Sequence, residues 1–180
     1  KVLLKNFQLL TNKPMIYVAN ISEGDITNPD NNKEYVRLKE QAKIEGCAII
    51  PVCANIEADV AMIEDKDERS MFLEEFGIKE SGLDKLIKTA YDILGLETFL
   101  TGGPDECRAW TFKKGMTAPQ CAGVIHTDFE RGFIKAEVYH YEDIHKYRTE
   151  AAIKEAGKYR IEGKDYVMKD GDVVFFRFNV

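Results

Sequence analysis

The sequence has 180 residues, of which 44% are hydrophobic and 31% are charged, and its formal net charge is −6. This composition is typical of a folded globular protein and excludes a disordered or fibrous chain, while the negative balance argues against a surface that coats nucleic acid. No apolar stretch approaches the roughly 20 residues needed to span a bilayer, so we expect no membrane partner.

The first residues, "KVLLKNFQLLTNKP", do not form a secretory signal peptide, because polar residues interrupt any apolar core and no small-residue cleavage site follows. Leu3, Phe7 and Leu10 instead recur at helical spacing, which predicts the tail of a helix. Since the chain also begins on Lys1, we expect that further residues precede it.

Strands and helices are expected to alternate in the first half. The apolar run Met15 to Ala19 predicts a short buried strand. A polar loop follows, and then a helix from about Lys33 to Glu45 that Gly46 closes. The second continuous apolar run, Cys47 to Cys53, is typical of a parallel strand buried on both faces.

Acid-rich helical pieces are expected next, at about 57–63 and 68–76. Ser81 and Asp84 form a capping-box pattern that begins another helix, and Gly95 ends it. Its apolar positions share one face: Leu83, Leu86, Ile87, Ala90, Tyr91 and Leu94. This order of elements favours a parallel α/β sheet, of which two strands form only a part.

The second half has a different pattern. Short β-type runs occupy 97–101, 107–112, 133–141 and 173–180, with helical segments near 119–124 and 149–157. A mixed sheet crossed by a short helix in about 85 residues indicates an α+β module of β-grasp type. We therefore expect two domains, residues 1–95 and residues 96–180.

One loop raises a functional question. Asn20-Ile21-Ser22-Glu23 follows the first predicted strand, and ligands of open α/β sheets bind at the carboxyl ends of strands. An Asn followed three residues later by an acid could read a nucleotide base there. The simpler interpretation is that Asn20 and Glu23 cap and solvate a turn.

Other chemistry is sparse. The four cysteines include no CxxC pair and the chain has three histidines, so we expect no metal site. Free thiols favour a reducing compartment, the cytoplasm. The acids Glu57, Asp59, Glu64 and Asp65 are interpreted as a solvated helix face, and no catalytic residue is expected in this chain.

Two groups of residues in the second half are candidates for a functional role, one centred on a histidine and one on a tryptophan. His126 lies beside Asp128, but no nucleophile accompanies them, so we expect a structural role or a partner contact. Trp110 with the nearby Lys113 and Lys114 fits either an RNA-stacking group or a buried tryptophan beside a solvated lysine turn.

Four stretches together resemble a known family: "NKPMIYVANISEGD", "IIPVCANIEAD", "ECRAWTFKKGMTAPQCAGVIHTDFERGFIKAEV" and "GKDYVMKDGDVVFFRFNV". They resemble the YchF family, the Obg-like ATPases, which are related to the P-loop translation-factor GTPases. The similarity runs along nearly all 180 residues, and the third stretch is its most specific part.

The resemblance implies an identity for each half. Residues 1–95 look like the C-terminal portion of the nucleotide-binding domain, and residues 96–180 look like a TGS domain. The sequence holds no G-x-x-x-x-G-K-[ST] run, the loop that cradles phosphates. The resemblance thus implies an ATPase whose phosphate groups and Mg²⁺ ligands lie outside this chain.

The resemblance also implies partners. The expected partner is the ribosome or RNA, and the expected oligomeric state is a monomer. Candidates for a ribosome-facing patch are Arg108, Arg131, Lys135, Lys158 and Arg160.

In the related GTPases the base-reading loop is Asn-Lys-x-Asp, and its carboxylate accepts two hydrogen bonds from guanine. Glu23 is one methylene longer than that Asp, and Ile21 replaces the Lys, so a bidentate contact tuned to about 2.7–2.9 Å should be weakened. The resemblance therefore implies binding of ATP, with GTP as the other candidate.

The expected base-site residues are Asn20, Ile21 and Glu23, with Cys53, Ala54 and Asn55 as the second loop. Two other interpretations stay open. One is a GTPase of the Obg-related class, and the other is a TGS module that binds the ribosome or RNA without catalysis.

Overall fold

The computed structural model describes residues 7, 9–103 and 106–179. The chain divides into two compact units between Ile93 and Leu94, here called the first unit and the second unit. The helix predicted around Leu3 falls largely outside the described residues. Among the helices that are described, none is both long and apolar enough to cross a membrane.

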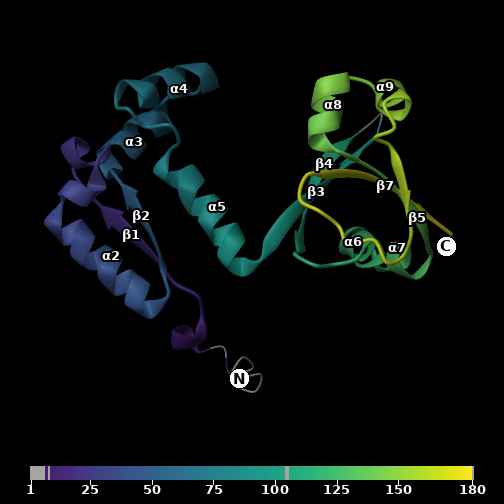
Figure 1. The fold of residues 1–180 in the computed structure, drawn as a ribbon, viewed down its shortest axis with the longest axis horizontal. Helices are drawn as coiled ribbons and strands as arrows, with labels where there is room; N and C mark the ends of the chain where they lie inside the picture. The colour runs from purple at the N-terminus through teal and green to yellow at the C-terminus, as the bar shows by residue number, and fades with distance from the viewer. Residues whose placement is uncertain (1–6, 8, 104–105, 180) are drawn as a thin grey trace. The chain divides into compact units, whose positions relative to one another are not determined.

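The first unit alternates strands and helices, as Figure 1 shows. β1 and β2 pair in parallel from Ile16–Ala48 to Asn20–Val52, which confirms the predicted parallel strands. The elements in chain order are η1 (Leu10–Asn12), β1 (Ile16–Asn20), η2 (Glu23–Asp25), η3 (Pro29–Asn31), α2 (Lys33–Glu45), β2 (Ala48–Val52), α3 (Ala54–Met62), α4 (Lys66–Glu75) and α5 (Gly82–Leu94).

The ends of α2 follow directly from its sequence. The Asn32 side chain accepts hydrogen bonds from the backbone N–H groups of Glu34 and Tyr35, both at 3.0 Å, which satisfies two donors of the first turn. Gly46 has φ 69°, the left-handed conformation that glycine adopts most easily, so the helix ends there as predicted.

The core of the first unit lies where α3, α4 and the segment after α4 meet, and its buried members are Cys53, Ile56, Val60, Leu73 and Ile78. The prediction of a buried strand at Met15 to Ala19 was wrong at Val18, which is 48% exposed on β1. Along α5, the apolar Leu83, Ile87 and Leu94 are also exposed. In the described part of the chain, these side chains have no element to cover them.

The second unit is a mixed sheet with helices. The described residues form a sheet of five strands in the order β4-β3-β7-β5-β6, in which β3 and β7 are parallel and the other neighbours are antiparallel. The elements are β3 (Leu96–Gly102), β4 (Cys107–Lys113), α6 (Ala118–Ile125), α7 (Thr127–Arg131), β5 (Phe133–His140), α8 (Tyr141–Tyr147), α9 (Glu150–Glu155), β6 (Arg160–Glu162) and β7 (Asp172–Phe178).

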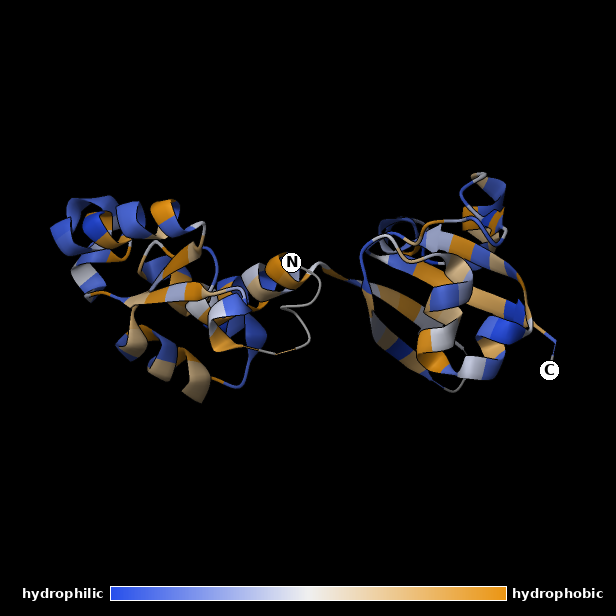
Figure 2. Ribbon diagram, turned by 90° about the horizontal axis from the view of Figure 1, so that it is seen from below, coloured by the Kyte–Doolittle hydropathy of each residue, from blue (hydrophilic) through white to orange (hydrophobic). Residues whose placement is uncertain are grey.

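Hydrophobic and hydrophilic residues alternate along the strands of this unit (Figure 2), so each strand gives one face to the core. The core joins the sheet to α6 and contains Phe99, Phe112, Cys121, Val138 and Phe176 among its buried members. Burial raises the pKa of the Cys121 thiol to about 12, so this cysteine is a neutral apolar group.

The sequence pattern missed α7, α8 and β6. Each is short, and α7 and α8 begin at histidines rather than at the usual capping residues. The Nδ1 atom of His126 accepts from the Asp128 N–H at 3.2 Å, and that of His140 accepts from the Glu142 N–H at 3.3 Å. An imidazole nitrogen thus replaces the side-chain oxygen that a cap normally uses.

Candidate nucleotide-base site

The two parallel strands bring the predicted loops to one edge of the sheet. Asn20 and Val52 are the last residues of β1 and β2, and they are paired. The Ile21 N–H then donates to the Val52 carbonyl at 2.8 Å, which continues the pairing one residue beyond β1. The loops that follow β1 and β2 therefore begin side by side, at the edge of the sheet where ligands of such sheets bind.

Asn20 joins the two loops directly. The Ala54 N–H donates to Asn20 Oδ1 at 3.1 Å. Because this bond needs an acceptor, it fixes the orientation of the amide and leaves the Nδ2 group as a donor. A donor in this position suits the N7 acceptor that adenine and guanine share.

The loops enclose a cavity of about 550 Å³, within the range of small-molecule sites. Its lining residues are Asn20, Ile21, Ser22, Glu23, Gly24, Cys53, Ala54 and Asn55. All six of the predicted base-site residues are thus brought together. Ser22 and Gly24 were not predicted, although both are neighbours of Glu23 in the sequence.

The loop after β1 is held by Asp25. Its carboxylate accepts from Ser22 Oγ at 2.8 Å and from Asn32 Nδ2 at 2.9 Å. The hydrogen bonds from Asn32 and Ser22 lower the pKa of Asp25, so the carboxylate stays charged under neutral conditions. Because Asn32 also caps α2, the loop that carries Glu23 is tied to the start of a regular helix.

Glu23 is the first residue of η2, a single three-residue turn. Its side chain is exposed and, within the described residues, makes no hydrogen bond or ion pair. The carboxylate is therefore available to an incoming ligand. Whether it contacts a base stays a prediction.

The second loop differs from expectation in its local structure. Ala54 and Asn55 are the first two residues of α3 rather than loop residues, and the buried Cys53 precedes the helix. The first N–H groups of a helix have no acceptor within it. One of them, from Ala54, donates to Asn20 Oδ1.

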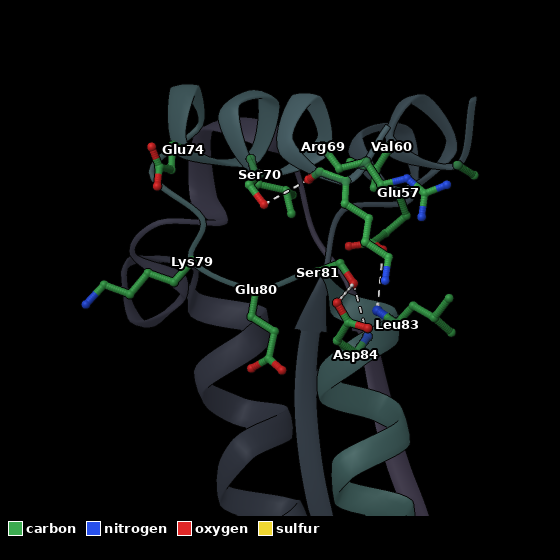
Figure 3. A pocket seen from close by; sticks show the side chains of 13 residues that line it. Glu57, Val60, Arg69, Ser70, Glu74, Lys79, Glu80, Ser81, Leu83 and Asp84 are labelled. Atoms are coloured by element: carbon green, nitrogen blue, oxygen red, sulfur yellow. Dashed lines mark hydrogen bonds between the residues drawn. The ribbon is translucent and has the colours of Figure 1, made fainter. Parts of the chain in front are cut away.

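A second cavity of about 490 Å³ lies where α3, α4 and the start of α5 meet (Figure 3). Glu57 accepts from the backbone N–H groups of Gly82 at 2.6 Å and Leu83 at 3.4 Å. Asp84 and Ser81 form the predicted capping pair, with Ser81 Oγ 2.9 Å from Asp84 Oδ2. The interpretation of Glu57 as a solvated acid was wrong, because it caps a helix 25 residues away.

The His126–Asp128 pair has a structural role in the second unit. His126 precedes α7 and caps it, and the carboxylate of Asp128 lies 3.4 Å from His126 Nδ1. Trp110 is partly buried, donates from Nε1 to Thr101 Oγ1 at 2.9 Å, and is covered by the Arg108 guanidinium 4.3 Å from its ring centre. Trp110 therefore packs on the core, and the Arg108 guanidinium covers one face of its ring.

Two of the cations proposed for a ribosome-facing patch, Arg160 and Lys135, form ion pairs within the second unit. Arg160 is bound to the buried Asp172 at 3.4 Å and to Glu162 at 3.2 Å, and Lys135 is 3.2 Å from Glu137. Among the described residues, no group of three or more His, Cys, Asp or Glu side chains is arranged to hold a metal ion.

Comparison with known proteins places these features in context. Residues 96–179 match the family YchF-GTPase_C, described as a protein of unknown function (DUF933). The chain is 56% identical, over 178 residues, to "Ribosome-binding ATPase YchF" of Bacillus subtilis, covering 99% of this chain and 48% of the relative. It is 47% identical to "Obg-like ATPase 1" of Xenopus laevis, covering 98% of this chain and 44% of the relative.

A solved structure agrees with these matches. The YchF GTPase of Schizosaccharomyces pombe superimposes with a TM-score of 0.83 at 39% identity, covering 98% of this chain and 46% of that one. The chain thus spans about half the length of the relatives that it matches. Sequence and fold agree over both units, and the chain belongs to the YchF family of Obg-like ATPases.

Proposed function

We propose that the cavity between the two loops is the base-reading part of a nucleotide site in a YchF-type ATPase. The observation that supports this most strongly is the hydrogen bond from the Ala54 N–H to Asn20 Oδ1, because it couples the two predicted loops around one cavity. In this proposal residues 1–95 are the C-terminal portion of the nucleotide-binding domain, and residues 96–180 are a TGS module of β-grasp type.

The hydrogen-bond pattern of the cavity favours adenine over guanine. Guanine presents the O6 acceptor together with two donors, so it needs a protein donor beside a bidentate carboxylate. The Ala54 N–H, one candidate donor, is already engaged by Asn20. Adenine presents its N6 amine, which one carboxylate oxygen of Glu23 or a backbone carbonyl can accept, and its N7 acceptor fits Asn20 Nδ2.

The phosphates and Mg²⁺ are held, in this proposal, by residues outside the chain, since it has no phosphate-binding loop motif. Hydrolysis in this class depends on positioning and electrostatic stabilisation of the transferred phosphoryl group. The present residues bind and orient the base. We further propose a cytoplasmic monomer that associates with the ribosome or RNA.

A competition titration of ATP against GTP on the longest available form of the protein tests this function. We expect ATP to displace a fluorescent nucleotide at lower concentration than GTP does. In the Glu23→Asp variant the shorter side chain restores the carboxylate position of the GTPase loop. The affinity for GTP should therefore rise relative to the affinity for ATP. Equal or tighter binding of GTP by the unaltered protein would favour the GTPase interpretation instead.

A further inference from the structure

Ser22 lies between Ile21 and Glu23 in the loop after β1 and lines the cavity that the two loops form. It is exposed and immediately precedes η2, the short turn that begins at Glu23. A serine before a helical turn commonly accepts a hydrogen bond from a backbone N–H group of that turn. Ser22 makes no such bond, and its Oγ instead donates to Asp25 Oδ2 at 2.8 Å.

The direction of this hydrogen bond is fixed by a chain of partners that ends at α2. Asn32 Oδ1 accepts from the N–H groups that begin α2, so Asn32 Nδ2 is the donor to Asp25, at 2.9 Å. The hydrogen bonds from Asn32 and Ser22 lower the pKa of Asp25, so at neutral pH its carboxylate is ionised and can only accept. The hydrogen of the Ser22 hydroxyl is therefore directed at Asp25, and the lone pairs of Oγ are what Ser22 can offer to a ligand.

An oxygen that can only accept distinguishes the two purines at one position. Adenine carries an amine at C6, which donates, whereas guanine carries the O6 oxygen, which accepts. Ser22 Oγ can therefore bind adenine N6, but it has no hydrogen left for guanine O6, and the two oxygens would repel each other. The Glu23 side chain makes no hydrogen bond or ion pair within the described residues, so no partner fixes its orientation in the same way.

We propose that Ser22 selects adenine over guanine by accepting a hydrogen bond from N6, and that Asp25 is the positioning residue that orients the Ser22 hydroxyl. Asn20 lines the same cavity and, in the function proposed above, donates to the neighbouring N7 atom, so the two side chains read one edge of the purine. The inference rests on that proposed function and assigns its base selectivity to one hydroxyl group.

Purine riboside triphosphate, which is ATP without the amine at C6, isolates this contact. Displacement of a fluorescent nucleotide from the longest available form of the protein gives the affinities for ATP, GTP and this analogue. In the unaltered protein we expect ATP to bind about two- to tenfold more tightly than the analogue, the range for one hydrogen bond between neutral groups. Ser22→Ala should abolish this difference and narrow the preference for ATP over GTP, whereas Ser22→Thr keeps the hydroxyl and should retain both.

Asp25→Ala tests the positioning role. Without the carboxylate the Ser22 hydroxyl can turn and donate to O6, so the affinity for GTP should rise relative to that for ATP. In the Ser22→Ala background, Asp25→Ala should leave this ratio unchanged, because the two residues act through one hydroxyl. A purely structural role of either residue would weaken the binding of both nucleotides alike and leave their ratio as it is in the unaltered protein.

Ser70→Ala is the matched control for the loss of a hydroxyl group. Ser70 Oγ donates to the Lys66 carbonyl at 3.0 Å on the exposed surface of α4, and Ser70 does not line the base cavity. We expect its nucleotide affinities to equal those of the unaltered protein. Circular dichroism establishes that each variant is folded before its binding is compared.

The outcomes separate this inference from the function on which it rests. If the unaltered protein prefers ATP to GTP but binds ATP and the analogue equally, or if Ser22→Ala keeps the difference between them, the inference is overturned and the proposed function stands. A preference for GTP, or no binding of either nucleotide, by the unaltered protein contradicts the proposed function and the inference together.

Discussion

At the scale of single residues, Asn20 links the two loops that form the candidate site. Its Oδ1 accepts the Ala54 N–H, and Asn20 lines the cavity, so Nδ2 is the donor that the side chain can still offer. The two halves of one amide therefore have separable roles. One half joins the loops, and the other is available to a purine.

The variant Asn20→Asp keeps the acceptor and removes the Nδ2 donor. We expect it to retain the fold but to bind ATP at least about tenfold more weakly, because a carboxylate would face the N7 acceptor of the base. Asn20→Ala removes both roles and should weaken binding at least as much. The nucleotide affinity of both variants, measured by displacement, checks this. Undiminished binding by Asn20→Asp would show that Nδ2 does not contact the base.

Gly82 illustrates a close approach that a side chain would prevent. A Cβ atom there would lie 2.5 Å from Val52 Cγ1 and 2.9 Å from Glu57 Oε1. We expect Gly82→Ala to destabilise the first unit by about 1–3 kcal/mol, the usual cost of overpacking. Gly24→Ala is the control, because a Cβ there meets nothing within 4 Å. Urea unfolding followed by circular dichroism measures both, and equal midpoints would contradict the packing argument.

At the scale of elements, the sequence predicted most of what positions the site. The capping residues of α2 and the pair at the start of α5 were readable because caps are local signals. The partner of Gly82, Glu57, was not readable, because 25 residues separate them. The loop residues could be grouped only through the parallel pairing of β1 with β2, whereas the exposed face of β1 depends on which elements cover it.

The cap of α2 gives a direct prediction. Asn32→Ala removes the acceptor of two backbone N–H groups and the donor to Asp25. We expect a loss of about 1 kcal/mol in stability, the typical value for a lost N-cap. Asn31→Ala, at the exposed neighbouring position, should be close to neutral. Urea unfolding of the two variants side by side checks the difference, and equal losses would assign the effect to the turn rather than the cap.

The pairing of β5 with β7 gives a pH dependence. The hydrogen bonds from Arg177 and then Tyr159 lower the pKa of Glu137 from 4.5 to about 2. A lowered carboxyl pKa stabilises the folded state above the unfolded value of 4.5, and this stability is lost as pH falls toward 2. Glu137→Gln should therefore cost about 1–3 kcal/mol at neutral pH and progressively less below pH 4.5. A difference that stays constant with pH would contradict the ion-pair explanation.

At the scale of the whole molecule, each unit has its own buried cluster, and that of the first unit is the smaller. The apolar side chains exposed on β1 and α5 bury little area and therefore add little to the stability of the first unit. We expect the first unit to unfold at lower denaturant concentration than the second. The one tryptophan of the sequence, Trp110, lies in the second unit and reports on it alone.

Two probes of one urea titration test this order. Circular dichroism, which reports on both units, should begin to change before Trp110 fluorescence does. Coincident transitions would instead show that the units unfold as one cooperative body.

The central claim is that the loops after β1 and β2 form a base-reading site that prefers adenine. The most direct measurement is an amide ¹H–¹⁵N NMR titration of the chain with ATP and, separately, with GTP, which detects weak binding residue by residue. The account predicts shifts concentrated at Asn20–Gly24 and Cys53–Asn55 that saturate at lower concentration with ATP. Shifts that lie elsewhere in the chain, or tighter saturation by GTP, would contradict it.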